Sequence, residues 1–253
     1  DAEELKKEES EKKVRVYDFK RAVRFSKDHI RSLTRIHENF ARYLTTYFSA
    51  QLRTFVQIHV VQVEQLPYDE FIRSIPKMTI LNIFEAKPLE GRMVMEVHPN
   101  VAFAMLDRLL GGSGSAPPKI HSLTEIETTI MERIFSRAFD SLQEAWKTVI
   151  DITPKMEALE TNPQFMQIVS PNETIALVSL STKIGDTSGM INLCLPHVVI
   201  EPIMPRLSVH HWFISQQKKK DDVEVLSLQE RVNKAHLPIV AELGESQISV
   251  HEF

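Results

Sequence analysis

A glycine-rich run is the feature of this sequence that most clearly calls for a special backbone conformation. Gly111-Gly112-Ser113-Gly114 holds three of the seven glycines in the chain. A phosphate-binding loop would follow a strand and begin a helix, whereas this run follows an expected helix over residues 99–110 and leads into Pro117 and Pro118. On the residues alone, a glycine helix cap and a connector are therefore favoured, and a partner-binding loop is the alternative.

Residue types that serve catalysis or metal binding do not gather into a recognisable site. The histidines are scattered apart from His210 and His211, and adjacent ligands rarely share one metal ion. The sequence has no His-Glu-x-x-His motif, no Gly-x-Ser-x-Gly turn and no dinucleotide fingerprint. Cys194 lies in an apolar run and is expected in the core. We therefore predict no catalytic residue, no metal site and no cofactor.

The composition is that of a globular protein. Of 253 residues, 43% are hydrophobic and 25% are charged, and the formal charge of -4 gives no overall attraction for nucleic acid. A single cysteine excludes an internal disulfide and favours a reducing compartment, so we expect a cytoplasmic protein. No apolar run approaches the ~20 residues of a membrane span. Because the sequence begins at Asp1, we expect it to be a piece of a longer chain.

Helices and strands are expected to frame the glycine run. Ser26 can cap a helix whose apolar residues recur every three or four positions as far as Leu52. A second helix is expected from Ser122, which stands in capping-box spacing with Glu125. Strand-like runs occupy residues 55–63, 79–85, 92–97, 165–170, 174–182 and 190–195. The body therefore alternates helix with sheet, as an α/β domain does.

Three short matches indicate an internal repeat. Residues 33–36 match residues 123–126, residues 76–80 match residues 171–175, and residues 91–99 match residues 189–196. The matches keep one order along the chain, which predicts two copies of a helix–strands–helix unit over residues 26–112 and 120–212.

Charge and composition divide the chain further. Residues 1–16 mix acidic and basic side chains with little to bury, so we expect a disordered tether. Residues 17–213 form the expected main domain. A polar and charged stretch over residues 214–222 predicts a linker, and residues 223–253 begin a second, incomplete domain.

Several motifs occur in a specific order along the main domain. They occupy residues 16–21, 68–71, 106–114, 123–127, 162–165, 171–173 and 200–202. Over residues 14–213 this set resembles the middle domain of the FliM family of flagellar motor switch proteins. Residues 223–253 look like the start of a SpoA-type domain. The resemblance implies a CheC/FliM-like layered α/β fold, with two helix–strands–helix repeats related by a pseudo-two-fold axis, followed by an incomplete SpoA-type β segment.

The resemblance also implies a function and a site. FliM-like proteins are non-enzymatic components of the rotor C ring, peripheral on the cytoplasmic face of the membrane at the flagellar basal body. Gly111, Gly112, Ser113 and Gly114 match the family's Gly-Gly-x-Gly element, which is associated with FliG. This favours the partner-binding interpretation of the run.

Further partners follow from the same resemblance. A SpoA-type domain implies FliN- or FliY-type proteins, and the ring implies neighbouring FliM-like subunits. Phosphorylated CheY is captured mainly by an N-terminal segment that has no counterpart here and is expected upstream of Asp1. Such an assembly transmits the chemotaxis signal that changes the direction of rotation.

The alternative function is that of the CheC-type phosphatases, which act on phosphorylated CheY and whose fold the expected fold also resembles. Their helices carry an Asp/Ser-x-x-x-Glu-x-x-Asn pattern. In the second copy, Arg133 stands where the pattern has glutamate and inverts the charge. The hydroxyl of Ser136 does not replace the amide of the asparagine. We therefore expect no phosphatase activity. The aligned positions are Thr129, Arg133 and Ser136 in the second copy and Asn39, Tyr43 and Thr46 in the first.

Overall fold

The computed structural model describes residues 24–116 and 120–207 of the chain. The expected tether, linker and SpoA-type segment lie outside these ranges, as do His210 and His211, so the domain boundaries stay predictions. The elements are α2 (Lys27–Leu52), β1 (Val56–Pro67), α3 (Tyr68–Ser74), β2 (Ile80–Lys87), β3 (Arg92–Val97), α4 (Pro99–Leu109), α5 (Glu125–Trp146), β4 (Thr153–Glu160), η1 (Pro163–Phe165), β5 (Thr174–Ile184), β6 (Thr187–Pro196), α6 (His197–Ile200) and η2 (Glu201–Leu207).

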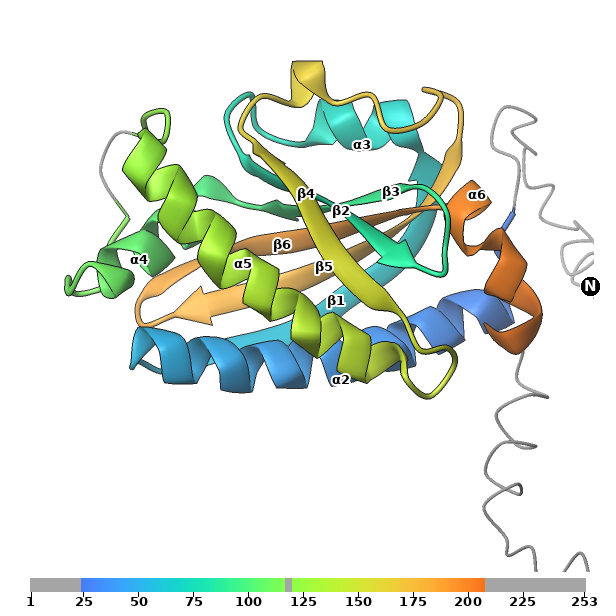
Figure 1. Ribbon diagram of the computed structural model, residues 1–253, viewed down its shortest axis with the longest axis horizontal. Helices are drawn as coiled ribbons and strands as arrows, with labels where there is room; N and C mark the ends of the chain where they lie inside the picture. Colours follow the sequence, from blue (N-terminus) through green and yellow to red (C-terminus); the bar gives the residue numbers. More distant parts are fainter. Residues whose placement is uncertain (1–23, 117–119, 208–253) are drawn as a thin grey trace, which may run out of the picture. The chain divides into compact units, whose positions relative to one another are not determined.

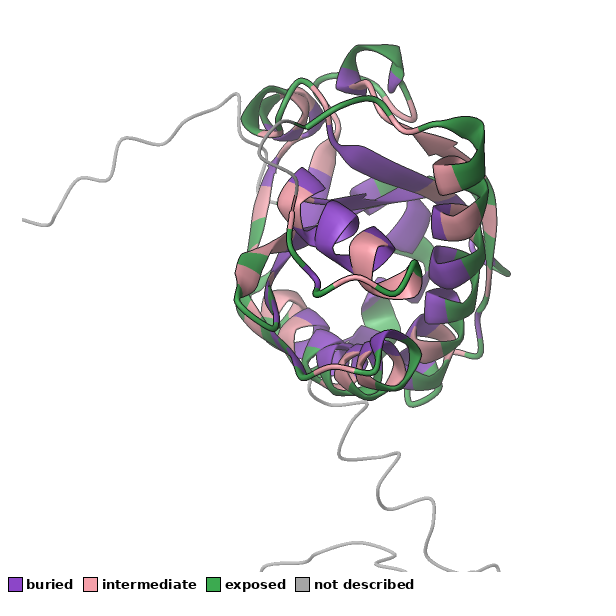
Figure 2. Cartoon of the chain, turned by 90° about the vertical axis from the view of Figure 1, so that its left-hand side faces the viewer, coloured by how far each residue is buried: buried purple, intermediate pink, exposed green. Residues whose placement is uncertain are grey.

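One antiparallel sheet of six strands organises these elements. Alternate residues of a strand point to opposite faces. Met93, Met95 and Val97 of β3 join the larger core with α2, α4 and α5. Val94 instead joins a smaller core with Tyr68 and Phe71 at α3. Helices therefore cover both faces, with α2 and α5 on the same side (Figure 1), and buried residues fill the space between them and the sheet (Figure 2).

The strand order, β1-β5-β6-β3-β2-β4, has a two-fold relationship. Exchanging β1 with β4, β2 with β5 and β3 with β6 turns the order into its own reverse. The two outer strands also share an irregularity, because the pairing skips Val61 in β1 and Glu157 in β4. This topology confirms the predicted fold class of two repeats about a pseudo-two-fold axis.

The axis passes between the two central strands. β3 and β6 pair Val94 with Cys194 and Val97 with Ile191. In the repeat, Val94 corresponds to Ile191 and Val97 to Cys194, so the exchange of the two copies converts each pair into the other. The match of residues 91–99 with 189–196 is therefore in the right register from residues 92 and 189 onward, and residues 76–80 and 171–175 likewise lead into the equivalent strands β2 and β5.

The helix caps correct one of the predicted correspondences. Ser26 caps α2, as expected, and accepts a hydrogen bond from the His29 backbone N–H. The cap of α5 is Thr124 rather than Ser122: its hydroxyl accepts from the Glu127 N–H, and the Glu127 carboxylate accepts from the Thr124 N–H at 2.8 Å. Aligning the two caps pairs buried Ile36 with buried Ile134, whereas the match of residues 33–36 with 123–126 pairs Ile36 with Ile126, which is 75% exposed, so that match is wrong.

Two further expectations about local structure were wrong. Residues 165–170 do not form a strand, because η1 and a turn-rich segment precede β5. The sixth strand is β4, which lies at the edge of the sheet and carries few strongly apolar residues.

Within residues 24–116 and 120–207, no helix combines the length and apolar character that a membrane crossing needs.

Candidate binding site at the glycine loop

The glycine loop, defined here as Gly111-Gly112-Ser113-Gly114, begins as the C-terminal cap of α4. The N–H of Gly111 donates to the carbonyl of Arg108 at 3.2 Å, and the N–H of Gly112 donates to the carbonyl of Asp107 at 2.7 Å. Gly111 has a φ of 95°. This pair of bonds with a left-handed glycine is the Schellman motif, which satisfies carbonyls left free at a helix end. The glycine cap expected from the sequence is therefore present.

The carboxylate of Asp107 holds the second half of the loop. Its Oδ2 accepts from the backbone N–H of Gly114 at 2.7 Å and from that of Ser115 at 3.2 Å. A Cβ on Gly112 would lie 2.1 Å from Asp107 Oδ1, closer than any side chain tolerates. The absence of a side chain at Gly112 thus lets the loop close over the carboxylate.

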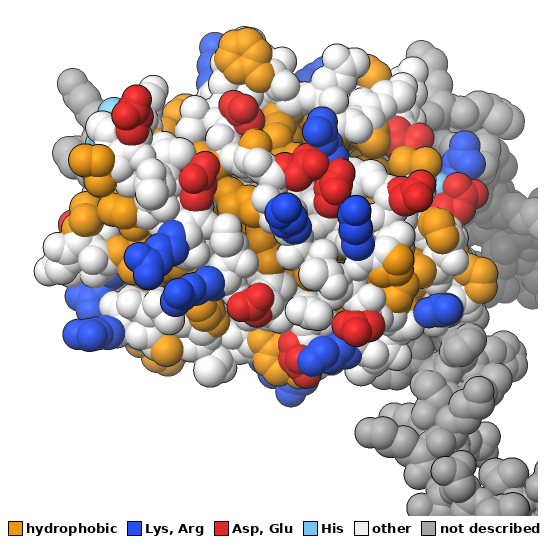
Figure 3. All heavy atoms as spheres, viewed as in Figure 1, with side chains coloured by type: hydrophobic (Ala, Val, Ile, Leu, Met, Phe, Trp, Pro, Cys, Tyr) orange, Lys and Arg blue, Asp and Glu red, His pale blue; other side chains and the backbone are white. Residues whose placement is uncertain are grey.

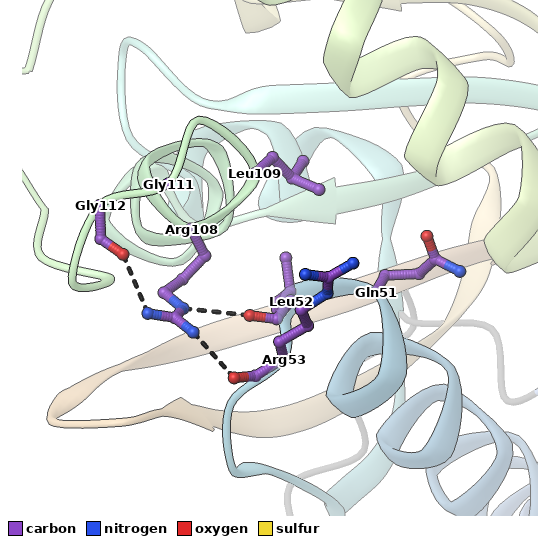
Figure 4. Close-up of a pocket in the computed structure, with 7 residues that line it drawn as sticks. All are labelled: Gln51, Leu52, Arg53, Arg108, Leu109, Gly111 and Gly112. Atoms are coloured by element: carbon purple, nitrogen blue, oxygen red, sulfur yellow. Dashed lines mark hydrogen bonds between the residues drawn. The ribbon is translucent and has the colours of Figure 1, made fainter.

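The guanidinium of Arg108 joins the loop to the end of α2. Its Nη1 donates to the Gly112 carbonyl at 2.9 Å, its Nε to the Leu52 carbonyl at 3.0 Å, and its Nη2 to the Arg53 carbonyl at 2.8 Å (Figure 4). Three donors in one planar fork therefore fix the end of α2 and the glycine loop relative to one another. Thr187, at the start of β6, adds a bond from its hydroxyl to the Gly114 carbonyl at 3.1 Å.

Exposure divides the four predicted site residues. Gly111 and Ser113 are exposed, Gly112 is half-buried and Gly114 is buried. Gly114 has a positive φ of 93° and packs against Arg108, whereas Gly112 is not left-handed. Valine at either position would disturb the loop itself.

One large exposed apolar side chain adjoins the glycine loop, and another follows the end of α2 to which Arg108 ties the loop. Leu110, directly before Gly111, is 64% exposed, and Phe55 is 70% exposed. Phe55 follows the Leu52–Arg53 corner that Arg108 binds, and its carbonyl accepts from the Gly185 N–H at 3.1 Å. Exposed apolar residues on a fixed backbone are suited to anchoring a protein partner.

Asp107, Arg108, Leu110 and Phe55 were not predicted as site residues. An aspartate and an arginine in the turn before paired glycines are a signal for the first two, since both types can bond backbone groups at a helix end. Leu110 adjoins the run and could have been found. Phe55 gives no such signal, because its connection to the loop is its place two residues after Arg53, whose carbonyl Arg108 binds.

Metal-binding clusters and the thiol of Cys194 were the other candidate groups. Among the described residues, no three His, Cys, Asp or Glu side chains lie close enough to bind a metal ion. Cys194 is buried in the sheet, and burial raises the pKa of its thiol far above the usual range. This thiol is therefore a core group.

The phosphatase-related positions require a correction in the first copy. Thr129, Arg133 and Ser136 are exposed along α5. Because Ser26 and Thr124 are the corresponding caps, their counterparts on α2 are not Asn39, Tyr43 and Thr46, as the sequence match suggested. The caps assign Arg31, Arg35 and Glu38 instead, and this set also lacks the glutamate followed by asparagine.

Comparisons with known proteins agree on one family. A family model described as "Flagellar motor switch protein FliM" matches residues 26–212. The flagellar motor switch protein FliM of Bacillus subtilis is 58% identical over 253 residues, which cover 100% of this chain and 76% of that protein. The FliM of Treponema pallidum is 43% identical over 241 residues, covering 95% of this chain and 70% of that protein.

A solved structure extends the comparison to the fold. A chain in the crystal structure of the FliG–FliM complex from H. pylori superposes with a TM-score of 0.70 and 38% sequence identity. The match covers 72% of this chain and 100% of that chain.

Proposed function

The chain belongs to the FliM family of flagellar motor switch proteins, and from this premise we propose that its glycine loop binds a FliG-type protein. The similarity to a chain of a FliG–FliM complex supports the proposal. The observation that carries it is the presentation of the loop: Gly111 and Ser113 are exposed on a backbone that Asp107 and Arg108 hold in place.

The physical basis of such binding is a preorganised backbone between apolar anchors. Nothing lies within 4 Å of the place where a Cβ on Gly111 would stand, so a partner's backbone can approach closely there. Leu110 and Phe55 offer apolar side chains to a partner. Burying each of them would contribute about 1.5–3 kcal/mol to the free energy of binding. Because the loop is already ordered, binding loses less conformational entropy than it would with a mobile loop.

The remaining roles are proposed from family membership. A SpoA-type domain that starts at residue 223 binds FliN- or FliY-type proteins, and the main domain stands beside neighbouring copies in the ring. Phosphorylated CheY is a further proposed partner. The assembly sits on the cytoplasmic face of the membrane at the basal body and transmits the chemotaxis signal to the direction of rotation.

The proposed function is non-enzymatic. The phosphatase alternative requires a carboxylate and an amide on one exposed helix face, and α5 carries Arg133 and Ser136 at those positions. Arg133 carries the opposite charge to a carboxylate and Ser136 lacks an amide, so this face does not present the pair that the phosphatase reaction needs.

The test is a titration of a FliG-type protein from the same organism against Leu110→Ser and Phe55→Ser. We expect each variant to bind about tenfold more weakly and to keep the melting temperature of the parent, since both side chains are exposed. Phe165→Ser is the matched control, because Phe165 is 77% exposed on η1, outside the loop. Unchanged affinity in both loop variants would refute the proposed function.

A further inference from the structure

A groove extends from the glycine loop between α2 and α5. We call it the arginine groove; it has a volume of about 290 Å³, and its lining includes Tyr47, Gln51, Leu109, Ile130, Arg133 and Arg137. A second hollow of about 390 Å³ adjoins the glycine loop and contains Arg53, Gly111 and Gly112 (Figure 4). The two hollows share Gln51 and Leu109, so they lie side by side and are treated together as one depression.

The charge of this depression is one-sided. Arg53, Arg133 and Arg137 line it, and none of the three forms an ion pair with any residue that the structure describes. No aspartate or glutamate lines either hollow. Asp140, the nearest acidic residue along α5 beyond Arg137, is exposed but does not line the groove. The carboxylates of Asp140, which acts on Tyr47 together with Arg137, and of Asp107, which lies against Gly112, are close by but form no ion pair with these arginines. Arginines without an ion pair attract an acidic ligand and are suited to bidentate pairing.

Apolar side chains lie beside the arginines. Ile126, Ile130, Arg133 and Arg137 follow one another at spacings of three or four along α5 and therefore share one helix face. Ile126 is 75% exposed. Space-filling spheres show apolar and basic side chains next to one another over α5 and the end of α2, on the left of Figure 3. This mixture is suited to an amphipathic acidic segment rather than to a purely polar ligand.

The floor of the groove is fixed. The Tyr47 hydroxyl donates to the Ile134 carbonyl at 2.9 Å, which ties α2 to α5. Leu109 stands between the two hollows in the last turn of α4. A ligand therefore meets a preformed surface, as it does at the glycine loop.

We propose that the FliG-type partner of the glycine loop lays a second segment, which carries acidic and aliphatic side chains, into the arginine groove. The inference rests on the proposed function, because a partner seated on Gly111 and Gly112 already borders the depression. Its carboxylates pair with Arg133 and Arg137, and its aliphatic side chains cover Ile126 and Ile130.

The experiment titrates a FliG-type protein from the same organism against the full chain and against Arg133→Glu/Arg137→Glu at low and high salt. At low salt we expect an affinity loss of about tenfold or more, and we expect the difference from the parent to shrink at high salt because screening weakens exposed charge pairs. The milder Arg133→Gln/Arg137→Gln should lose less affinity. Melting curves check that each variant stays folded.

The matched control is Arg35→Glu/Arg206→Glu, which reverses two exposed arginines outside the groove. If the groove variant binds the partner as the control does, the inference is wrong, and a loss in Leu110→Ser shows that the proposed function still stands. If neither loop nor groove variants lose affinity, both fail. If the groove variant changes self-association in sedimentation instead, the occupant is a second copy and the inference is overturned.

Discussion

Arg108, in the last turn of α4, donates its Nε hydrogen to the carbonyl oxygen of Leu52, the last residue of α2, over 3.0 Å. The last carbonyls of a helix lack partners within the helix, and α2 has no basic side chain in its own last turn. Arg108 therefore serves as a cap supplied by another helix, and the same guanidinium holds the glycine loop.

Replacing Arg108 with lysine should loosen this junction. An ammonium group cannot donate in three fixed directions to Leu52, Arg53 and Gly112 at once. We expect the free energy of unfolding to fall by about 2 kcal/mol. Hydrogen exchange should quicken at the Gly112 and Gly114 amides. Arg35→Lys is the control, because Arg35 is exposed on α2. Equal exchange rates in the two variants would show that the guanidinium does not order the loop.

Gly112→Ala and Asp107→Ala should not be additive. Alone, Gly112→Ala forces the Asp107 carboxylate away from its place, and the Gly114 and Ser115 N–H groups lose their acceptor. Once Asp107 is already alanine, the added methyl group meets no carboxylate and costs less. A double-mutant cycle by chemical denaturation should therefore give a coupling of about 1 kcal/mol. Ser113→Ala, in the exposed part of the loop, is the control. An additive result would contradict the steric account.

Stability should depend on pH through His37. This residue is buried on α2 against the rings of Phe40 and Trp146, and its Nδ1 bonds the Leu33 carbonyl at 2.8 Å. Burial lowers the pKa of His37 from 6.5 to about 4. Between these values the unfolded chain binds a proton that the folded chain excludes, so this contribution to stability is present above pH 6.5 and is lost as the pH falls toward 4.

The shift corresponds to about 3 kcal/mol. Denaturation at several pH values should show a shallower acid loss for His37→Phe than for the parent. Phe48→Leu is the control, since it alters the same core without removing a titratable group. A parental slope in His37→Phe would contradict the prediction.

The sequence was sufficient for elements whose pattern is local. The apolar stripe of α2, its Ser26 cap and the glycine cap of α4 each depend on residues within a few positions. The start of α5 could not be chosen in this way, because Ser122 with Glu125 and Thr124 with Glu127 have the same spacing. Only the structure shows that Thr124 and Glu127 are the pair that forms the capping box.

Elements that depend on contacts between distant residues could not be predicted from local sequence patterns. β4 has an alternating but weakly apolar sequence, because it lies at an edge of the sheet with one neighbour, β2. The bonds of Arg108 to the Leu52 and Arg53 carbonyls depend on the approach of α4 to the end of α2, which no spacing reveals. The glycine run, with the aspartate and arginine before it, could be recognised from its residues, whereas its attachment to the end of α2 could not.

A buried carboxyl group lies where the two repeats meet. Glu96 of β3 pairs in register with Asn192 of β6, whose Nδ2 donates to Glu96 Oε2 at 2.7 Å. The Thr79 hydroxyl contacts Glu96 Oε1 and also lies 3.0 Å from the Val97 carbonyl. Burial raises the pKa of Glu96 above 4.5, although the bonds from Thr79 and Asn192 oppose the shift.

Glu96→Gln should therefore be at least as stable as the parent at pH 7, and Glu96→Ala should be less stable. A glutamine oxygen can accept from Asn192, and its amide can donate to the Thr79 hydroxyl, which then donates to the Val97 carbonyl. Alanine leaves the Asn192 amide without this acceptor, at a cost of about 1–3 kcal/mol.

Above pH 4.5 the unfolded chain releases the Glu96 proton before the folded chain does, so the parent loses stability relative to Glu96→Gln as the pH rises. Denaturation of the three proteins across this range measures the difference, and a parent that gains on Glu96→Gln with rising pH would show that the ionised carboxylate is favoured in the fold.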